Sequence, residues 1–376
     1  MRAPVLCMQT ANNTSTIIRD VGTRFSCGEV RAHSTLTTAL KKHGFQVEEN
    51  YIIPTAFRTT YSSREGGGPT IAVLLEYDAL PEVGHACGHN LIAEAGLAAA
   101  IGIKAAMEAD ATIRGQLLVL GTPAEERNGG KIDLIRGGAF EGVAAAMMVH
   151  PMNCTSSSPQ MLSIMRVSVN FKGQPAHAAA FPWQGRNALD AAVSAYTNIA
   201  MLRQQIKSDC RVQAILTKGG SVPNIIPDEA TLELSVRAPT SQEMHALFER
   251  VRACVESGAK AAGCDLHFDV ERSSYDNLIS DKVIAEIYKG FAERMGIVDS
   301  DSDIPLGSSD MGNVSHLVPS IHPFYALPTD APNHSRPFTD AAGSPSAQGP
   351  TLGAAKALAL TALALMRRSG VLEKTH

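Results

Sequence analysis

Short apolar runs alternate with stretches of helical periodicity along much of this chain, and this alternation restricts the fold more than any other feature. The run at 71–77 is apolar except for one glutamate, and turn-forming residues bound it at Gly66–Pro69 and at Pro81, which is typical of a buried strand. The pattern predicts strands at 71–77, 116–120 and 143–149 and helices at about 90–107, with Asn90 as the N-cap, and 131–136. Strands that alternate with helices form a mostly parallel sheet with helices on its faces, so we predict an α/β fold.

The middle of the chain has a different pattern. Between 163 and 274 the expected elements follow the order β-α-β-β-α-β, which is the signature of a ferredoxin-like α+β sandwich. Its strands are expected near 163–171, 212–216, 231–236 and 265–270, and its helices near 187–205 and 241–262. Further elements follow at 282–294, 321–326 and 349–367. We therefore interpret 1–162 and 275–376 as two parts of one catalytic domain, and 163–274 as an inserted domain that closes as a lid.

Composition excludes several classes of protein. The 376 residues are 44% hydrophobic and 19% charged, which suits a soluble chain with a buried core. The net charge is -4, without a lysine- and arginine-rich run, so neither nucleic acid nor a membrane is an expected partner. Seven scattered cysteines indicate a reducing compartment such as the cytoplasm. No secretory signal is expected, while Arg2, Arg19 and Arg24 leave a transit peptide open.

The segment His85–Asn90 follows the first predicted strand and carries two residue types that bind borderline-soft metals. Cys87 and His89 are separated only by Gly88, which allows both side chains to turn toward one point. Taken alone, this pair also fits a buried thiol beside a helix-capping histidine.

Candidate ligands also follow the next two predicted strands. The strand at 116–120 leads to Glu125 and Glu126, and the strand at 143–149 leads to His150. The carboxyl ends of parallel strands form the ligand-binding edge of such a sheet. Adjacent carboxylates repel one another unless a cation lies nearby, although a solvated acidic turn paired with Arg127 is an equally good interpretation of the two glutamates alone.

One further histidine, His334, lies in a polar loop before the last helix. The whole candidate ligand set is Cys87, His89, Glu126, His150 and His334. Five ligands are too many for one tetrahedral catalytic zinc with an open position, but they suit two ions that share a bridging ligand. Glu125, which this set does not need, is the candidate base that takes a proton from the activated water and passes it to a leaving amine.

The inserted domain offers residues that are able to contact a substrate. His177, in Gly173–Ala178, is a candidate hydrogen-bond donor to a developing oxyanion. Arg237 lies thirteen residues after Asn224 and has the geometry to bind a carboxylate with two hydrogen bonds. An ion pair with Glu229 or Glu233 explains Arg237 nearly as well.

In order and spacing, these motifs resemble those of the peptidase M20 family of two-metal aminoacylases, carboxypeptidases and dipeptidases. The similarity extends from about residue 29 to 366, and it is greatest to the branch with cysteine in place of the bridging aspartate, which includes amidohydrolases of auxin and aminobenzoyl-glutamate conjugates. The motifs that carry it are Tyr77–Pro81, His85–His89, Pro123–Glu126, His150–Pro151, Gly173–His177, Gly219–Pro227 and His334.

The resemblance implies a cytosolic dipeptidase that acts on β-alanyl or γ-aminobutyryl dipeptides of lysine and ornithine. An N-acyl-amino-acid amidohydrolase of the aminobenzoyl-glutamate or aminoacylase type is the alternative. The resemblance further implies a zinc-peptidase-type catalytic domain, with two zinc or manganese ions on the five ligands above and Glu125 as the base. The inserted domain would form a homodimer, and His177, Asn224 and Arg237 would contact substrate, with His177 often reaching the neighbouring subunit's site.

One departure from the wider family concerns its His-x-Asp motif, which is Glu76-Tyr77-Asp78 in this chain. Asp78 is therefore expected at most to orient a ligand from outside the metal's coordination sphere. Two other interpretations remain. Beside the two-metal hydrolase, these are a cysteine hydrolase with Cys87 as nucleophile and His89 as base, and a catalytically silent relative that binds dipeptides.

Overall fold

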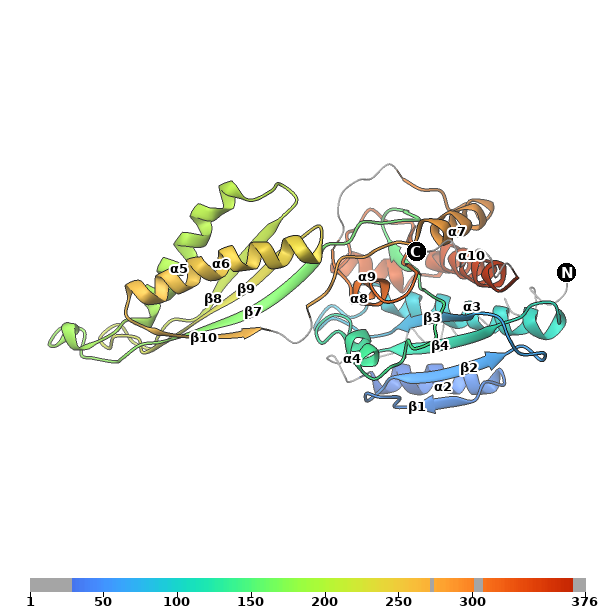
Figure 1. Ribbon diagram of the computed structural model, residues 1–376, viewed down its shortest axis with the longest axis horizontal. Helices are drawn as coiled ribbons and strands as arrows, with labels where there is room; N and C mark the ends of the chain where they lie inside the picture. Colours follow the sequence, from blue (N-terminus) through green and yellow to red (C-terminus); the bar gives the residue numbers. More distant parts are fainter. Residues whose placement is uncertain (1–28, 271–273, 301–306, 368–376) are drawn as a thin grey trace. The chain divides into compact units, whose positions relative to one another are not determined.

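The computed structural model describes residues 29–270, 274–300 and 307–367 (Figure 1). The N-terminal segment in which a transit peptide was left open lies outside these residues. The chain forms two compact units. Of the described residues, unit 1 contains 29–160, 278–300 and 309–367, and unit 2 contains 161–270, 274–277 and 307–308.

A six-stranded sheet forms the centre of unit 1, with the strand order β1-β2-β4-β3-β5-β11. Strands β3, β4, β5 and β11 are parallel to one another, whereas β2 and β1 add an antiparallel edge. The bounds are β1 Val47–Glu49, β2 Phe57–Ser62, β3 Thr70–Glu76, β4 Gln116–Thr122, β5 Ala145–Met147 and β11 Ser320–Ile321. Every residue of β3 and β4 after the first is buried, as in parallel strands covered on both faces. The predicted α/β class is confirmed.

Two segments that the sequence pattern presents as single strands are each divided in the structure. The region 143–149 contributes β5, after which β6 (His150–Met152) leaves the main sheet and pairs in parallel with β12 (Phe324–Ala326). The region 321–326 divides in the same way into β11 and β12. Pro323 lies between β11 and β12 and lacks the N–H donor that a continuous ladder needs, which accounts for the second division, whereas Pro151 lies inside β6.

The helices of unit 1 pack against this sheet and against one another. They are α2 Val30–Lys42, α3 His89–Ala109, α4 Gly130–Arg136, α7 Lys282–Arg294, α8 Met311–Ser315, α9 Arg336–Ala342 and α10 Gln348–Arg367. One hydrophobic core takes residues from α2, α3, α7 and α10 together with β3 and β4. Two helical segments, His89–Ala109 and Pro345–Arg367, are long and apolar enough to cross a membrane by length and hydropathy, but 72% and 50% of their apolar windows are buried inside the protein. Both are core helices.

Unit 2 is an antiparallel sheet with two helices. Its strand order is β10-β7-β9-β8, and each neighbouring pair is antiparallel. The bounds are β7 Ser163–Lys172, α5 Ala188–Leu202, β8 Arg211–Lys218, β9 Glu229–Ala238, α6 Ser241–Ala261 and β10 Asp265–Val270. Both helices lie on one face of the sheet (Figure 1), and their apolar residues form a core with alternate residues of β7 and β9. The β-α-β-β-α-β order is the predicted ferredoxin-like one.

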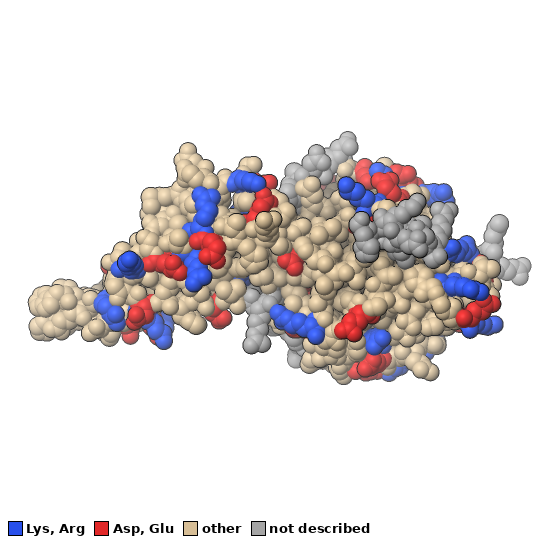
Figure 2. Space-filling view, viewed as in Figure 1, with Lys and Arg blue, Asp and Glu red and all other residues tan. Residues whose placement is uncertain are grey.

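Charged side chains of both signs are interspersed on the surface. On the face in Figure 2, lysines and arginines lie beside aspartates and glutamates rather than in a continuous stripe. Several form exposed ion pairs, such as Lys207 with Glu243 and Lys218 with Glu229.

Candidate metal centre

Four segments of unit 1 bring the five predicted ligand residues to one place. Ligand atoms of Cys87, His89 and His150 all lie within 4.8 Å of one another, and so do those of Cys87, Glu126 and His334. Cys87 belongs to both groups, so the geometry suits two neighbouring ions that share its sulfur. His89 with Glu125 and Glu126 forms a third such group, so the candidate base lies beside the candidate ligands.

Gly88 allows the loop before α3 to present both Cys87 and His89. Its backbone is left-handed, with φ +81°, and a Cβ at this position would lie 2.5 Å from Cγ of Pro151 and 3.3 Å from a ring carbon of Phe338. Only glycine adopts this conformation at such a close approach without strain. Consequently Cys87 Sγ lies 3.5 Å from His150 Nε2, while His89 begins α3.

Hydrogen bonds fix the orientation of two candidate histidine ligands. His89 Nδ1 lies 2.8 Å from Asp78 Oδ1, and the other oxygen of Asp78 accepts the Glu126 backbone N–H at 2.9 Å. His150 Nδ1 lies 2.8 Å from the carbonyl oxygen of Pro151. When Nδ1 donates to an oxygen, Nε2 carries the lone pair that binds a metal. Asp78 therefore has the orienting position that the sequence suggested.

The electrostatics of the centre favour a thiolate at Cys87. Burial raises the pKa of its thiol, but the imidazoles of His89 and His150 and hydrogen bonds from His150 and His334 outweigh burial and hold the pKa well below its usual value. A thiolate is the form of cysteine that binds metal. Burial lowers the pKa of His89, but the negative charges of Asp78 and Cys87 outweigh burial and hold this pKa well above its usual value.

The two adjacent glutamates are not a solvated turn, so that alternative does not hold. Glu125 is only 7% exposed, and burial together with the charges of Glu76, Glu126 and Asp310 raises its pKa well above the usual value. Burial and the charge of Cys87 also raise the pKa of Glu126. Bound cations would offset this concentration of negative charge.

The centre opens to solvent at His334. Its side chain is 55% exposed, and its Nε2 lies 3.3 Å from Glu126 Oε1. The backbone N–H of His334 donates to the carbonyl oxygen of Ala86 at 2.8 Å, which ties this loop to the segment that carries Cys87.

The residues present fit a pair of divalent ions. The set provides one sulfur, three imidazoles and one carboxylate, a mixture that both zinc and manganese accept. Nε2 of His89 is buried, and in the described part of the chain it has no hydrogen-bond partner. An ion at this nitrogen would satisfy it.

The three candidate substrate contacts lie in unit 2. His177 and Asn224 are exposed neighbours: residue 177 forms a β-bridge with Ile225, and the N–H of Ala178 donates to the Asn224 carbonyl at 3.0 Å. Arg237, on β9, donates to Ser308 Oγ at 3.1 Å. Its suggested acidic partners have other contacts, since Glu229 pairs with Lys218 and Glu233 accepts a hydrogen bond from Ser168.

Several buried polar residues around the centre were not predicted from the sequence. Glu76, Lys131 and Asp310 form a connected ion network. The imidazole of His322 is fully buried, and its ring centroid lies 5.5 Å from that of His150. The available signal was a single glutamate in the otherwise apolar run at 71–77. No sequence feature marks Lys131, Asp310 or His322 in the same way.

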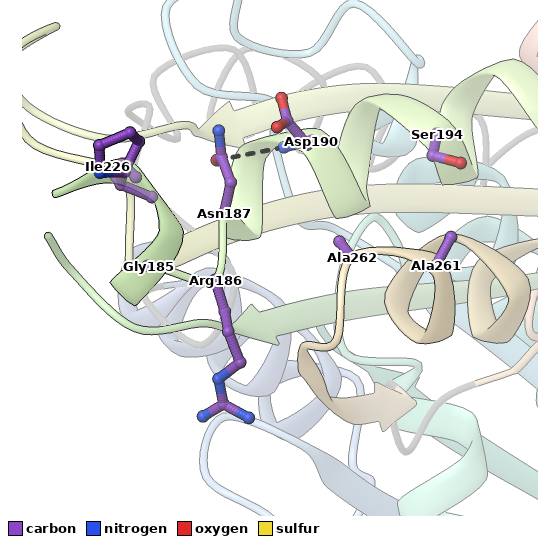
Figure 3. Close-up of a pocket in the computed structure, with 10 residues that line it drawn as sticks. Gly185, Arg186, Asn187, Asp190, Ser194, Ile226, Ala261 and Ala262 are labelled. Atoms are coloured by element: carbon purple, nitrogen blue, oxygen red, sulfur yellow. Dashed lines mark hydrogen bonds between the residues drawn. The ribbon is translucent and has the colours of Figure 1, made fainter. Parts of the chain in front are cut away.

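A pocket of about 530 Å³ lies in unit 2, between the start of α5 and the end of α6 (Figure 3). Asn187 and Asp190 line it, and Oδ1 of Asn187 accepts the backbone N–H groups of Leu189 and Asp190 as the cap of α5. Small residues such as Gly258 and Ala261 form another wall. None of the candidate metal ligands lines this pocket.

Comparisons with known proteins add independent information. A model of the peptidase dimerisation domain matches residues 162–263. Two curated relatives are Xaa-Arg dipeptidases, from Mus musculus and Homo sapiens, which are 44% and 40% identical over 358 and 362 residues; each match covers 92% of this chain and 83% of the relative. One of the subunits of p-aminobenzoyl-glutamate hydrolase from Escherichia coli (strain K12) is 35% identical over 262 residues, covering 64% of this chain and 54% of that protein.

Solved structures with low sequence identity share the fold. An aminobenzoyl-glutamate utilization protein from Klebsiella pneumoniae matches with a TM-score of 0.71 at 18% identity, covering 95% of this chain and 98% of that one. A dinuclear metal-binding peptidase of the M20 family from Bacillus subtilis matches with a TM-score of 0.69 at 20% identity, covering 93% and 99%.

Proposed function

This chain belongs to the peptidase M20 family of metallohydrolases, and from that premise we propose that it hydrolyses the amide bond of small dipeptide-like substrates at a centre of two divalent ions. The observation that carries this proposal is the position of Cys87, whose sulfur belongs to two separate groups of candidate ligand atoms. We assign Cys87, His89 and His150 to one ion and Cys87, Glu126 and His334 to the other. Zinc and manganese are the proposed metals.

The proposed reaction divides the chemistry between the ions and the protein. When bound, a pair of such ions supplies Lewis-acid activation of water and of the scissile carbonyl group. Glu125 takes a proton from the attacking water as the new C–O bond forms, and donates it to the nitrogen as the C–N bond breaks. Its buried position beside His89 and Glu126 supports this role.

We propose dipeptides with a basic C-terminal residue as the substrates. The names of the two relatives at 44% and 40% identity support arginine at this position, and lysine and ornithine carry the same positive charge. A β-alanyl or γ-aminobutyryl group is the acyl part that the sequence resemblance suggested. The second candidate is hydrolysis of an N-acyl amino acid of the aminobenzoyl-glutamate type, which the relative at 35% identity favours.

Unit 2 is proposed to complete the site and to form a homodimer. Arg237 would bind the substrate carboxylate, Asn224 would contact the substrate, and His177 would donate to the developing oxyanion, in its own or the neighbouring subunit's site. The match of residues 162–263 to a dimerisation domain supports the dimer. A cytoplasmic location, with neither nucleic acid nor a membrane as partner, completes the proposal.

A panel of substrates tests this function. Purified full-length protein would be assayed with zinc or manganese added back after chelation, on dipeptides that end in arginine, lysine, ornithine or alanine and on N-acyl amino acids. We expect turnover that depends on metal and prefers basic C-terminal residues. Full turnover after removal of metal would instead favour a cysteine hydrolase, and binding of dipeptides without turnover would favour a silent relative.

A further inference from the structure

Exposed apolar side chains gather on two adjacent segments of unit 2, residues 174–185 and 219–227. A β-bridge between His177 and Ile225 joins the two segments. Their exposed large apolar residues are Phe181, Trp183, Val222 and Ile225, of which Trp183 is 76% and Phe181 50% exposed. None of these four belongs to the hydrophobic core of unit 2. Because packing does not account for them, and exposed apolar groups that lie together often mark a binding surface, this part of unit 2 is a candidate for contact with a ligand.

The backbone holds Phe181 and Trp183 close to His177. The N–H of Phe181 donates to the carbonyl oxygen of His177 at 3.0 Å. Phe181 is also the N-cap of the short 3₁₀-helix η1 (Pro182–Gln184), in which Trp183 is the middle residue. Nδ1 of His177 accepts the backbone N–H of Ala180 at 3.1 Å, so a neutral imidazole carries its proton on Nε2. The aromatic pair therefore begins one turn of backbone after the histidine that we propose as a donor to the substrate.

The rings of Phe181 and Trp183 meet at a right angle. Their centroids are 6.0 Å apart, and their planes are inclined at 86°. A cation in the corner between two such rings can lie within about 6 Å of both centroids, which is the range in which aromatic faces attract ammonium and guanidinium groups. Tryptophan attracts them most strongly. The pair therefore has the geometry of a small cation-binding corner.

The charges around this corner do not compete for a cation. Residues 174–185 and 219–227 contain no aspartate, glutamate, lysine or arginine. The flanking basic residues each have an acidic partner, since Arg186 pairs with Asp265 and Lys218 with Glu229. The aromatic faces are thus the groups that these two segments offer to a positive charge.

We propose that Phe181 and Trp183 determine specificity by binding the positively charged side chain of the substrate's C-terminal residue. The inference rests on the proposed function, which assigns basic C-terminal residues to the substrate and places His177 at its scissile carbonyl group. In a dipeptide, the C-terminal side chain begins at the second atom after the scissile carbonyl carbon. A substrate that accepts a hydrogen bond from His177 therefore brings its cationic side chain to the neighbourhood of the aromatic pair.

The first test compares two substrates of the same shape, β-alanyl-arginine and β-alanyl-citrulline, of which only the first carries a positive side chain. The ratio of their kcat/KM values would be measured for full-length, metal-loaded wild-type protein, Trp183→Leu, Phe181→Leu and Trp183→Phe. Tyr196→Leu is the matched control, because Tyr196 is an exposed aromatic residue of α5 whose ring is already occupied by the guanidinium of Arg203, 5.8 Å from its centroid. Sedimentation equilibrium would report the oligomeric state of each variant.

We expect the wild-type protein to prefer the arginine substrate, and this preference to fall by about 5- to 30-fold in Trp183→Leu. It should fall in Phe181→Leu as well, return in part in Trp183→Phe and stay at the wild-type value in Tyr196→Leu. An unchanged preference in Trp183→Leu, or equal turnover of both substrates by the wild-type protein, would overturn the inference. An unchanged preference with loss of the dimer would assign the pair to a contact between subunits.

A second test needs no turnover and does not require Trp183 to be replaced. Trp183 is the single tryptophan of the chain, so the tryptophan emission reports on this residue alone. Metal-loaded Glu125→Gln, which lacks the proposed base, would be titrated with both dipeptides. We expect a saturable change in emission at lower concentrations of the arginine dipeptide than of the citrulline dipeptide. Binding of the arginine dipeptide in a calorimeter without a change in emission would overturn the inference. No turnover of any dipeptide by the wild-type protein would instead contradict the proposed function, and the inference would fall with it.

Discussion

At the scale of single residues, the position of Glu125 determines what it is able to do. The carboxyl group is buried, and burial is the largest cause of its raised pKa, followed by the charges of Glu76 and Glu126. A carboxyl group with a raised pKa is well suited to accept a proton and then to donate it near neutral pH. Its place beside the candidate ligands, rather than its charge alone, makes it the proposed base.

Glu125→Gln tests this role directly. We expect kcat to fall by about 10²- to 10⁴-fold, because an amide cannot take the proton of the attacking water, while the bound metal stays at the wild-type level. Glu141→Gln is the control, since Glu141 is an exposed residue of unit 1. Steady-state kinetics together with elemental analysis of the same samples provide the measurement. A Glu125→Gln protein with wild-type kcat would remove Glu125 from the mechanism.

The shared sulfur makes a second prediction at this scale. Cys87→Ala should weaken the binding of both ions, because it removes the atom that both candidate groups contain. His150→Ala should weaken the binding of one ion, and His334→Ala should weaken the binding of the other. Calorimetric titration of the metal-free proteins with zinc distinguishes these patterns. If Cys87→Ala lost only one ion, Cys87 would not be a ligand that the two ions share.

Spacing in the sequence predicted the candidate ligand residues but not the buried residues around them. Cys87, His89, Glu126 and His150 all follow predicted strands, so their convergence was predictable from the rule for parallel sheets. Glu76, Lys131 and Asp310 are separated by 55 and 179 positions. Tertiary packing alone brings them together, and each has an ordinary solvated interpretation in the sequence.

At the scale of elements, the turn before α3 is the feature on which the geometry of the site depends. Asn90 was expected to cap this helix, and that prediction is wrong: the helix begins one residue earlier, after the left-handed Gly88. Asn90 instead donates from its side chain to the carbonyl oxygen of Ala342. Residue type alone favours Asn90 as the N-cap, but it does not show that His89, a candidate metal ligand, is the first residue of the helix.

Gly88→Ala tests the importance of this turn. The left-handed conformation alone costs an alanine about 1–2 kcal/mol, and the added carbon would meet Pro151 at 2.5 Å. We expect a thermal midpoint several degrees lower and weaker metal binding. Gly102 lies on the same helix, and a Cβ added there would be 4.0 Å from the Cβ of Ala359. Gly102→Ala should therefore leave metal binding unchanged and leave the thermal midpoint unchanged or raise it. Equal behaviour of the two variants would argue against a special role for Gly88.

At the scale of the whole molecule, unit 2 has a free sheet edge that suits the proposed dimer. Strand β8 is the last strand in the order of its sheet, and Ile215 on this strand is 63% exposed. Exposed apolar edge strands tend to pair with another chain. The order of the elements in unit 2 was predictable from hydrophobic periodicity, but the exposure of this edge depends on the strand order, which the sequence does not specify.

Ile215→Lys is expected to convert the proposed dimer to a monomer, because a charge on the edge strand opposes pairing. Val298→Lys is the control, since Val298 is 64% exposed in unit 1. Sedimentation equilibrium over a range of concentrations measures the result. A wild-type monomer, or a dimer that persists in Ile215→Lys, would contradict the assignment of this edge.

The most direct test of the two-metal centre is X-ray diffraction from crystals of the metal-loaded protein, with anomalous data collected above and below the absorption edge of the bound metal. We expect two anomalous peaks per chain, one among Cys87, His89 and His150 and the other among Cys87, Glu126 and His334, with the sulfur of Cys87 between them. A single peak, or peaks remote from Cys87, would contradict it.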